Sequence, residues 1–412
     1  MTWDHEFFSG ERRLTSKLKH LVLRRYVKEF AYHLGSVQPI VYYVDGFAGA
    51  GVYTSGSHRE DGSPLLIARL AQELRTAPRA IQLRCLNVEA DRERFESLEA
   101  ETDAFKPEIV EQNYHSTFVD ALPNILERIG DAATFFFIDP FGTKDIPFAE
   151  LLPAFNRKHT TEVLITLQTA GIATKAGWFA NEDSSKPGER ETARKLTEHL
   201  AVALDLPIAK LRQGWSDSLV EGGTDALEER VRRWYVRRLK TSKRTRFKFS
   251  KSFKVLYRPA DRKSSTCFHL VFATQHQKGL YEMNNAMASA LEALYADLYS
   301  GTLFPGFAEE REEQSGRAAV RREILSHFAN SVFTIEDVKR HCMQETDCVL
   351  KEGDYRTLVL QKRKNGELSR VDSGPLTKEA SASTSQAPNR TPGVSDISVA
   401  ASLLWLGRYE PS

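Results

Sequence analysis

The clearest signal for chemistry in the sequence is a glycine-rich run at residues 45–51, which reads DGFAGAG. An apolar stretch typical of a buried strand, Ile40–Val44, precedes this loop, and a helix is predicted over residues 63–75 with Ser63 as its N-cap. Glycines let a backbone approach a ligand closely, and a helix N-terminus adds a positive dipole. Strand, loop and helix in this order favour a nucleotide-like ligand over a plain tight connection.

A second candidate is Glu89, which follows a strand predicted over residues 81–88. An acid at this point of a nucleotide-binding sheet can accept hydrogen bonds from both ribose hydroxyls. We expect Glu89 to bind a ribose, the alternative being a solvated acid at a strand end.

The glycine loop resembles the first motif of class I S-adenosylmethionine-dependent methyltransferases, in the D-x-F-x-G-x-G form of enzymes that act on exocyclic amines. The resemblance implies that S-adenosylmethionine is the cofactor. It also implies which residues of the loop contact this cofactor: Asp45, Gly46, Phe47, Gly49 and Gly51.

The run DPFG at 139–142 resembles the D/N-P-P-Y/F motif of amino-methyltransferases. In that motif the first side chain and the next carbonyl accept hydrogen bonds from the target amine, and the aromatic ring stacks on the base. The resemblance implies that Asp139 and Pro140 orient a nitrogen nucleophile. This chain has Phe141 at the third position and Gly142 at the fourth, so the apolar or stacking wall is assigned to Phe141.

Several separated motifs in order resemble the three-Cys-motif partner proteins (TcmP): YVDGFAG at 43–49, GSP at 62–64, FIDPFG at 137–142 and HLVFATQHQKGL at 269–280. The resemblance extends from about residue 15 to residue 371. It implies a bacterial protein with a methyltransferase-like core. It also implies a partner, a three-Cys-motif protein that resembles radical-SAM enzymes and is encoded nearby.

Polar residues after other predicted strands are further candidates, because the carboxyl ends of parallel strands form the ligand edge of such sheets. Asn113 or His115, after the third strand, is expected to bind the adenine of the cofactor. The residues expected to border a substrate, or else to lie in surface loops, are Thr166, Gln168, Thr169, His276 and Lys278.

The charge of the chain is concentrated in one segment. The whole sequence has a net charge of +2, but residues 230–263 hold 15 Lys or Arg and one acid, Asp261, which leaves −12 for the rest. Aromatic residues such as Trp234, Tyr235, Phe247 and Phe253 interleave with these cations. Clustered cations with aromatics favour nucleic-acid binding over an ordinary solvated surface. The residues expected to contact nucleic acid are Arg232, Arg233, Arg237, Arg238, Lys240, Lys243, Arg244, Arg246, Lys248 and Lys251.

The elements that must position these residues alternate along the chain, which predicts an α/β fold with a parallel sheet and helices on both faces. The resemblance to class I methyltransferases implies that this sheet is Rossmann-like. Strands are predicted over 81–88, 109–113, 134–139, 162–167 and 269–274, and helices over 11–34, 91–101, 118–129 and 279–299. The domains expected are a methyltransferase-like domain at 1–307 with a basic insertion at 180–263, a winged-helix-like domain at 319–372, and a disordered tail at 373–412, within which 376–402 is rich in Ser, Thr, Ala and Pro.

Composition sets limits on class. The 412 residues are 41% hydrophobic and 27% charged, and no apolar run approaches the length that spans a bilayer. The four cysteines form no CxxC pair, so we expect a cytoplasmic protein with buried cysteines and no metal, rather than a site built on His341, Cys342 and Cys348.

The sequence thus favours a methyltransferase of nucleic acid, DNA or RNA, acting at a base nitrogen. One alternative is a non-catalytic partner protein that binds nucleic acid and recruits the three-Cys-motif protein. Another is a methyltransferase of a protein or small molecule.

Overall fold

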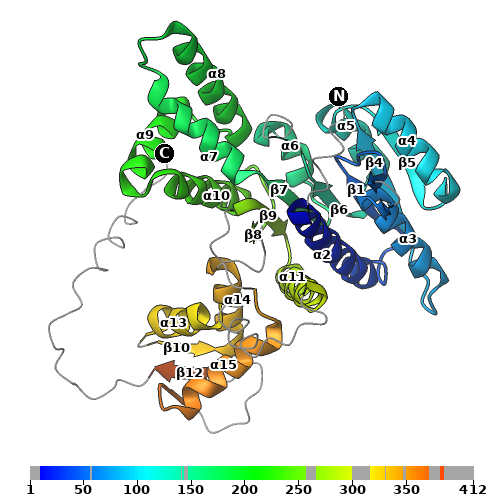
Figure 1. Ribbon diagram of the computed structural model, residues 1–412. Helices are drawn as coiled ribbons and strands as arrows, with labels where there is room; N and C mark the ends of the chain where they lie inside the picture. Colours follow the sequence, from blue (N-terminus) through cyan, green and yellow to red (C-terminus); the bar gives the residue numbers. More distant parts are fainter. Residues whose placement is uncertain are drawn as a thin grey trace, which may run out of the picture.

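The computed structural model describes residues 10–55, 58–140, 142, 147–256, 266–298, 316–329, 331–346, 349–370 and 381–384. Figure 1 shows a large α/β unit and a smaller C-terminal unit that packs beside it. No helix in this part of the chain is long and apolar enough to cross a membrane.

The large unit is built on one seven-stranded sheet. The strands lie in the order β5 (Val110–His115), β4 (Leu83–Glu89), β1 (Val41–Asp45), β6 (Ala133–Ile138), β7 (Thr161–Leu167), β9 (Thr266–Thr274) and β8 (Phe249–Leu256). All neighbours are parallel except β9, which runs antiparallel to both β7 and β8. Strands wound outward in both directions from a central β1 form the doubly wound Rossmann-like sheet of methyltransferases, which confirms the predicted fold class.

Alternating side chains of the central strands enter two apolar cores, one on each face of the sheet. Val41 and Tyr43 of β1 belong to the core beneath α2 (Gly10–Leu34), α3 (Ser63–Thr76) and α11 (Gln277–Leu298). Tyr42 and Val44 belong to the core beneath α5 (Phe118–Ile129), α6 (Phe148–Phe155) and the helical insertion. Because both faces are covered, β6 and β7 are buried along their whole length.

Three local features differ from the sequence prediction. Helix α3 is preceded by Gly62 as N-cap, and Ser63 is its first helical residue, with no side-chain capping bond. Between the glycine loop and α3 lies a hairpin of β2 (Val52–Ser55) and β3 (His58–Asp61). Strand β8 is not predicted, because Lys251 and Lys254 interrupt its apolar pattern.

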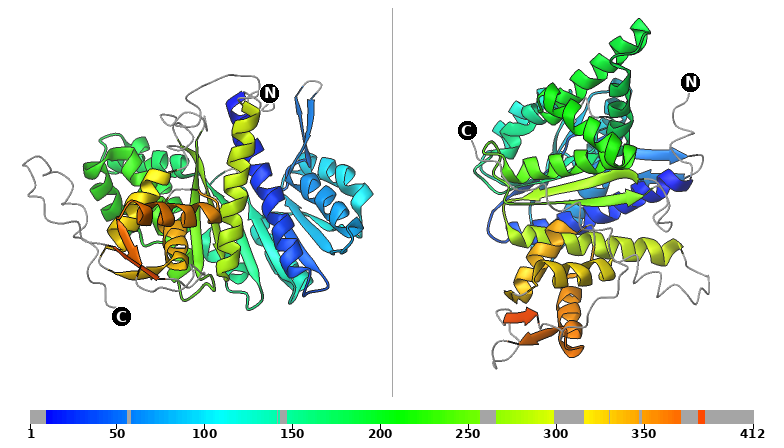
Figure 2. Two further views of the ribbon diagram at one scale, coloured as in Figure 1. Left: turned by 90° about the horizontal axis from the view of Figure 1, so that it is seen from below. Right: turned by 90° about the vertical axis from the view of Figure 1, so that its left-hand side faces the viewer.

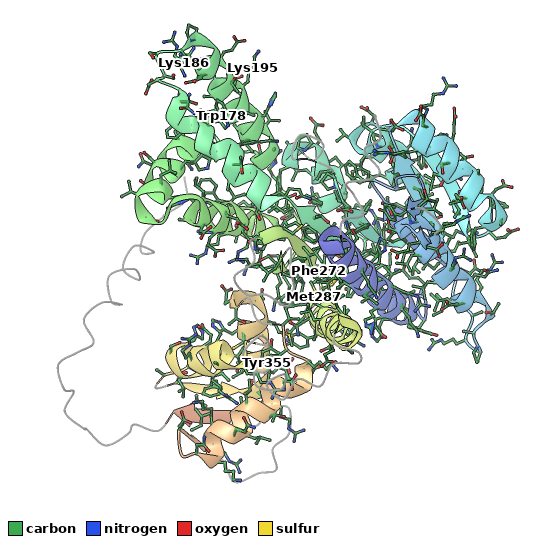
Figure 3. The ribbon with its side chains drawn as sticks, viewed as in Figure 1. Trp178, Lys186, Lys195, Phe272, Met287 and Tyr355 are labelled. Carbon is green, nitrogen blue, oxygen red and sulfur yellow. The ribbon has the colours of Figure 1, made fainter. Side chains whose placement is uncertain are left out.

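The insertion between β7 and β8 is helical. Its elements are α7 (Thr169–Gly177), the short helix η3 (Trp178–Asn181), α8 (Pro187–Leu204), α9 (Ile208–Glu221) and α10 (Gly223–Thr241). Figure 3 shows Trp178, Lys186 and Lys195 at the end of this insertion that lies far from the sheet, whereas Phe272 and Met287 lie in the core between β9 and α11.

The C-terminal unit contains α13 (Arg317–His327), β10 (Val332–Thr334), α14 (Ile335–Glu345), α15 (Glu352–Lys364), β11 (Leu368–Arg370) and β12 (Ser381–Thr384). The elements from α13 to β11 lie within the range 319–372 predicted for this domain, apart from the first two residues of α13. The expectation of disorder is wrong for residues 381–384, because β12 pairs antiparallel with both β10 and β11. The rest of the predicted tail, 373–380 and 385–412, lies outside the described residues.

This unit is anchored on α11, as both views in Figure 2 show. Leu280 and Tyr281 of α11 belong to the same apolar cluster as the C-terminal helices. The Asn285 side chain accepts a hydrogen bond from the backbone N–H of Glu352 at 2.9 Å, and Lys351 forms an ion pair with Glu292 at 2.5 Å. Apolar burial and directed polar contacts together fix the position of the unit on the large one.

A buried carboxyl group ties α2 to the amino end of β7. Glu162 accepts hydrogen bonds from the hydroxyls of Tyr26 and Thr274, and a Cβ on Gly279 would collide with its Oε1. Burial raises the pKa of Glu162 to about 7, although both hydrogen bonds oppose the shift.

Glu162 is expected to make stability depend on pH. Since its pKa is raised from 4.5 to about 7 in the folded state, its contribution is fully present below pH 4.5 and is lost as pH rises through 7. A shift of this size corresponds to about 3 kcal/mol. Glu162→Gln mimics the neutral acid: its carbonyl oxygen accepts from one of the two hydroxyls, and its NH₂ group donates to the other. Thermal midpoints of the two proteins are expected to diverge between pH 5 and pH 8 in favour of the variant, and a constant difference would contradict this role.

Candidate functional site

The glycine loop joins the carboxyl ends of β1, β4 and β6. Gly46 N–H donates to the Phe137 carbonyl at 2.9 Å, and Ala48 N–H donates to the Val88 carbonyl at 2.9 Å. Gly49 has φ +66°, and a Cβ placed on it meets no atom within 4 Å, so its open side is available to a ligand. The backbone of the loop is therefore held firmly while one side of it stays uncovered.

Two other glycines of the loop serve internal packing. A Cβ on Gly46 would lie 3.0 Å from the Phe118 ring at the start of α5. Gly51, with φ +83°, is buried against α4 (Arg92–Thr102) and accepts a hydrogen bond from Gly62 N–H at 2.8 Å. Gly46 and Gly51 are thus packed inside the protein, whereas Gly49 has an uncovered side.

Glu89, the last residue of β4, fastens the loop from the neighbouring strand. Its Oε2 accepts a hydrogen bond from Gly49 N–H at 2.8 Å and its Oε1 accepts one from Asp91 N–H at 2.7 Å. A carboxylate offers about four acceptor positions, so two remain for ribose hydroxyls. The geometry fits the predicted role and adds a second one, the orientation of the loop.

Asp45 differs from its predicted role. Its side chain is fully buried and accepts hydrogen bonds from the Tyr43 hydroxyl at 2.9 Å, from Phe47 N–H at 3.2 Å and from Ser63. Burial raises the pKa of Asp45 to about 6, and these hydrogen bonds oppose the shift. A carboxylate with no exposed surface supports the loop from inside, so its side chain does not contact a cofactor. Phe47 packs against Phe118 with ring centroids 6.1 Å apart.

Asp139 follows β6 at the same edge of the sheet and forms an ion pair with Lys19 of α2. Lys19 contacts Oδ2, and Oδ1 has no hydrogen-bond partner within the described ranges. Burial alone would lower the pKa of Lys19, but the Asp139 carboxylate outweighs this and raises it. Pro140 is buried, and Phe141 lies outside the described residues, so its predicted stacking role has no structural counterpart here.

Three residues beside Asp139 are missed by the sequence analysis. Lys19 and His20 come from α2, and Tyr53 comes from β2, with the His20 and Tyr53 rings stacked at 6.0 Å. Burial and the positive charge of Lys19 lower the pKa of His20 to about 4, so this imidazole is neutral at pH 7. A Lys-His pair between apolar positions of a predicted amphipathic helix is the available signal, and it is a weak one.

Asn113 is occupied by internal contacts. Its side-chain amide donates to Glu99 at 2.7 Å and to Thr102 at 2.8 Å, and its carbonyl accepts from Asn87 at 2.8 Å. This network joins β4, α4 and β5, which leaves Asn113 little capacity for an adenine. The alternative, His115, is exposed and lies opposite Glu89 in the pairing of β4 with β5.

The direction of β9 corrects another expectation. Because β9 is antiparallel to β7, its end at Thr274 pairs with Glu162 at the amino edge, so His276 and Lys278 lie away from the candidate site. The start of β9 takes their place, since His269 pairs with Leu167 at the carboxyl edge. Thr169, among the residues predicted to border a substrate, lies there too.

His269 belongs to a buried polar group at this edge. Thr169 Oγ1 lies 2.9 Å from His269 Nδ1 and donates to Glu228 of α10 at 2.8 Å. Burial, with the nearby cations of Arg232 and Lys254, lowers the pKa of His269 to about 3. Thr166 is buried as well, and its hydroxyl has no partner in the described part of the chain.

The basic segment is more neutralised than its charge sum implies. Glu229 pairs with Arg232 and Arg233, Asp205 pairs with Arg238 and Arg244, and Glu345 of the C-terminal unit pairs with Lys240. These acids lie outside residues 230–263, so a count within that window omits them. The predicted contacts of these five cations with nucleic acid compete with ion pairs inside the protein.

The structure corrects the nucleic-acid contacts predicted for Lys251 and for the interleaved aromatic residues. Lys251 is 1% exposed, with its Nζ 3.1 Å from Asn284 Oδ1, so it cannot contact phosphate. Tyr235, Phe247 and Phe253 are likewise buried in the two cores and cannot stack on bases. Their sequence spacing reflects the inner faces of α10 and β8.

The loop between α10 and β8 contains exposed cations that are predicted to contact nucleic acid. This loop lies at the amino edge of the sheet. Arg246 N–H donates to the Phe155 carbonyl at the end of α6, and Lys248 N–H donates to the Thr274 carbonyl. Strand β7 has seven residues, so this loop and the Asp139 edge are separated by about 20 Å. These cations therefore lie at the opposite edge of the sheet from Asp139. Arg237, Lys243 and Lys248 have no ion-pair partner within the residues that the structure describes.

No family model matches the chain, and no curated protein matches it either. Among solved structures, a Legionella pneumophila protein of the DUF519 family model is 13% identical, with 70% of this chain and 94% of that chain covered and a TM-score of 0.39. The O-methyltransferase TomG from Streptomyces achromogenes, solved with SAM, is 16% identical, with 67% and 100% covered and a TM-score of 0.30. A geranyl diphosphate C-methyltransferase from Streptomyces coelicolor is 12% identical, with 61% and 75% covered and a TM-score of 0.25.

Proposed function

We propose that the protein is an S-adenosylmethionine-dependent methyltransferase whose substrate is a nucleic acid, DNA or RNA, methylated at a base nitrogen. The observation that carries the proposal is that Gly49, Glu89 and Asp139 meet at one edge of a methyltransferase-like sheet. Uncovered loop backbone and free acceptor positions on Glu89 fit the polar and ribose parts of the cofactor. The bound cofactor supplies an electrophilic methyl group.

The chain's own residues then position the nucleophile. Lys19 holds Oδ2 of Asp139, which leaves Oδ1 to accept a hydrogen bond from an amine. The adjacent Pro140 carbonyl is assigned the second acceptor position. Two acceptors at fixed positions align the nitrogen lone pair with the methyl group, and alignment is the main source of rate in such a transfer. The proton lost by the nitrogen passes to Asp139 or to water.

A polyanionic substrate is supported by exposed cations on two surfaces. Arg237, Lys243 and Lys248 form the first, along α10 and the loop after it. The second lies on α15 and the turn after it, where Arg356, Arg363 and Lys364 are exposed. The C-terminal unit has the order helix, strand, two helices and two strands, which supports its proposed assignment as a winged helix. A structured nucleic acid can span the distance from these surfaces to Asp139 where a mononucleoside cannot.

Charge reversal on the first surface is expected to weaken nucleic-acid binding in a salt-dependent way. Replacing Arg237, Lys243 and Lys248 by glutamate should flatten the slope of log affinity against log salt by about 1 for each phosphate that the variant no longer neutralises. Fluorescence anisotropy with a labelled oligonucleotide at several salt concentrations measures this slope. The control reverses two exposed lysines elsewhere in the insertion, Lys186, which precedes the first residue of α8, and Lys195 of α8. An unchanged slope in the triple variant would contradict the assignment.

The proposal as a whole is tested by offering the full chain labelled S-adenosylmethionine with separate pools of DNA, RNA and protein. Label in a nucleic-acid pool is the expected result. Label only in protein would overturn the substrate class and keep the reaction.

A second candidate is a non-catalytic partner of a three-Cys-motif protein. It is favoured by the contact of Lys19 with Asp139, which already occupies one oxygen of the carboxylate. Cofactor binding without transfer to any pool, unchanged by Asp139→Ala, would favour this candidate.

A further inference from the structure

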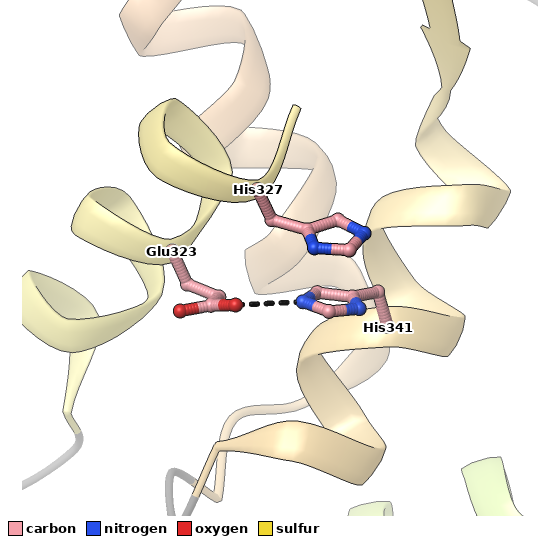
Figure 4. A group of neighbouring side chains, drawn as sticks. All are labelled: Glu323, His327 and His341. Carbon is pink, nitrogen blue, oxygen red and sulfur yellow. Dashed lines mark hydrogen bonds and ion pairs between the residues drawn. The ribbon is translucent and has the colours of Figure 1, made fainter. Parts of the chain in front are cut away.

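Three side chains of the C-terminal unit bring metal-ligand atoms together on its surface. Glu323 and His327 lie four residues apart on α13, and His341 comes from α14. One donor atom from each lies within 4.8 Å of the other two. Figure 4 shows the His327 ring lying over the His341 ring, with the Glu323 carboxylate at the edge of His341.

The contacts inside this group are close. Glu323 Oε1 and His341 Nε2 are 2.7 Å apart, and the two imidazole centroids are 3.5 Å apart with planes 15° from parallel. Each imidazole has two ring nitrogens, and a neutral ring offers a lone pair on one of them. Neutral imidazole nitrogen and carboxylate oxygen are the donors that bind zinc and its neighbours in the first transition series.

The helices beneath the group are held in place by the apolar core of the unit. Val320 and Ile324 of α13 and Val338 and Cys342 of α14 are fully buried. Phe328, which follows α13, packs edge-on against the His341 ring at 5.5 Å. The backbone positions are thereby fixed, and the ligand side chains need only rotate about their own bonds to converge.

We propose that Glu323, His327 and His341 bind a divalent transition-metal ion of the zinc class. Three protein ligands with water in the fourth position make an open tetrahedral site, and the exposure of His327 gives the ion and this water access. Metal ions bind the deprotonated forms of these donors, so binding releases any proton that the ligand atoms carry. The thiol of Cys342 is buried in the core and is not one of the ligands. The metal site that the sequence analysis considers on His341 and the nearby cysteines is therefore a different one.

Another group in the described part of the chain provides the matched control. Glu29, His33 and Glu282 also bring donor atoms within 4.8 Å of one another. This group has one imidazole only, and Lys278 Nζ lies 3.2 Å from His33 Nδ1, so a cation already stands beside it. Replacing a histidine by glutamine is therefore expected to weaken metal binding in the group around His341 and to leave it unchanged in the group around His33.

The experiment titrates the full, tag-free chain with Co²⁺ and then displaces it with Zn²⁺. The wild type is expected to develop the visible absorption of tetrahedral Co²⁺, saturating at one ion per chain and abolished by Zn²⁺. His341→Gln and His327→Gln should each weaken Zn²⁺ binding in calorimetry by about tenfold or more, as for the loss of one ligand. His33→Gln should leave it unchanged.

Folding is checked without metal, because His341→Gln can still donate a hydrogen bond to Glu323. Equal thermal midpoints of the metal-free proteins attribute a weakened affinity to the missing ligand. If a variant unfolds, Glu323→Gln replaces it, with the same expected loss. Undiminished Zn²⁺ affinity in the His327→Gln/His341→Gln double variant, or an absent Co²⁺ band in the wild type, would overturn the site.

Discussion

Asp139→Asn is expected to lower the rate of methyl transfer by about 100-fold or more, with cofactor affinity unchanged within about twofold. Lys19 donates to one oxygen of Asp139, so the carboxamide oxygen of the variant must turn toward Lys19. The amide NH₂ group then faces the position of the substrate amine, where a donor meets a donor. Single-turnover transfer and calorimetric titration with S-adenosylmethionine measure the two quantities.

The control for this variant is Lys19→Met, which removes the cation and keeps the carboxylate. If Asp139 acts by accepting from the amine, this variant keeps most of the transfer activity that Asp139→Asn abolishes. Equal losses in both would assign the effect to the ion pair and its position on α2. Full activity of Asp139→Asn would contradict the role of Asp139 altogether.

Glu89→Ala is expected to weaken cofactor binding by about 100-fold or more, since hydrogen bonds to a charged group contribute about 1.5–3 kcal/mol each. The substitution removes the acceptor proposed for two ribose hydroxyls. It also leaves the N–H groups of Gly49 and Asp91 without the carboxylate that orients them. Calorimetry with S-adenosylhomocysteine measures the loss without turnover.

Two further variants are compared with Glu89→Ala for their cofactor affinity. Glu89→Gln retains one acceptor oxygen and places an NH₂ group against one of the two backbone donors, so an intermediate loss is expected. Glu96→Gln, on the exposed face of α4, changes the same charge away from the loop and should bind the cofactor normally. Normal affinity in Glu89→Ala would contradict the ribose site.

The elements at the carboxyl edge of the sheet are readable from sequence because their signals are local. A continuous apolar strand, a glycine loop and a strand-end acid identify β1, Gly49 and Glu89 within short windows of residues. Asp139 follows from the same reasoning. The fold class is a consequence of strands and helices that alternate along the chain.

What the sequence misses depends on contacts between distant segments. Lys19 reaches Asp139 across 120 residues, and nothing near Lys19 in the sequence signals this partner. The direction of β9 is a property of the sheet, so His276 is expected at the wrong edge and His269 is overlooked.

The predictions of surface charge and of burial are wrong for the same reason, since both depend on contacts between distant segments. The acids that neutralise the basic segment, among them Asp205 and Glu345, lie outside its window. Lys251 resembles a surface cation in sequence, but Asn284 of α11 accepts its hydrogen bond in the interior. Aromatics spaced along α10 and β8 fill the cores, so a pattern typical of base stacking here reflects packing.

The central claim is most directly tested by mass spectrometry of nucleosides from RNA and DNA pools incubated with the full chain and S-adenosylmethionine that carries a deuterated methyl group. The predicted result is one nucleoside carrying the deuterated methyl on a base nitrogen, in the wild-type reaction and not in the Asp139→Asn reaction. A wild-type protein that binds the cofactor and leaves both pools unlabelled would contradict the claim.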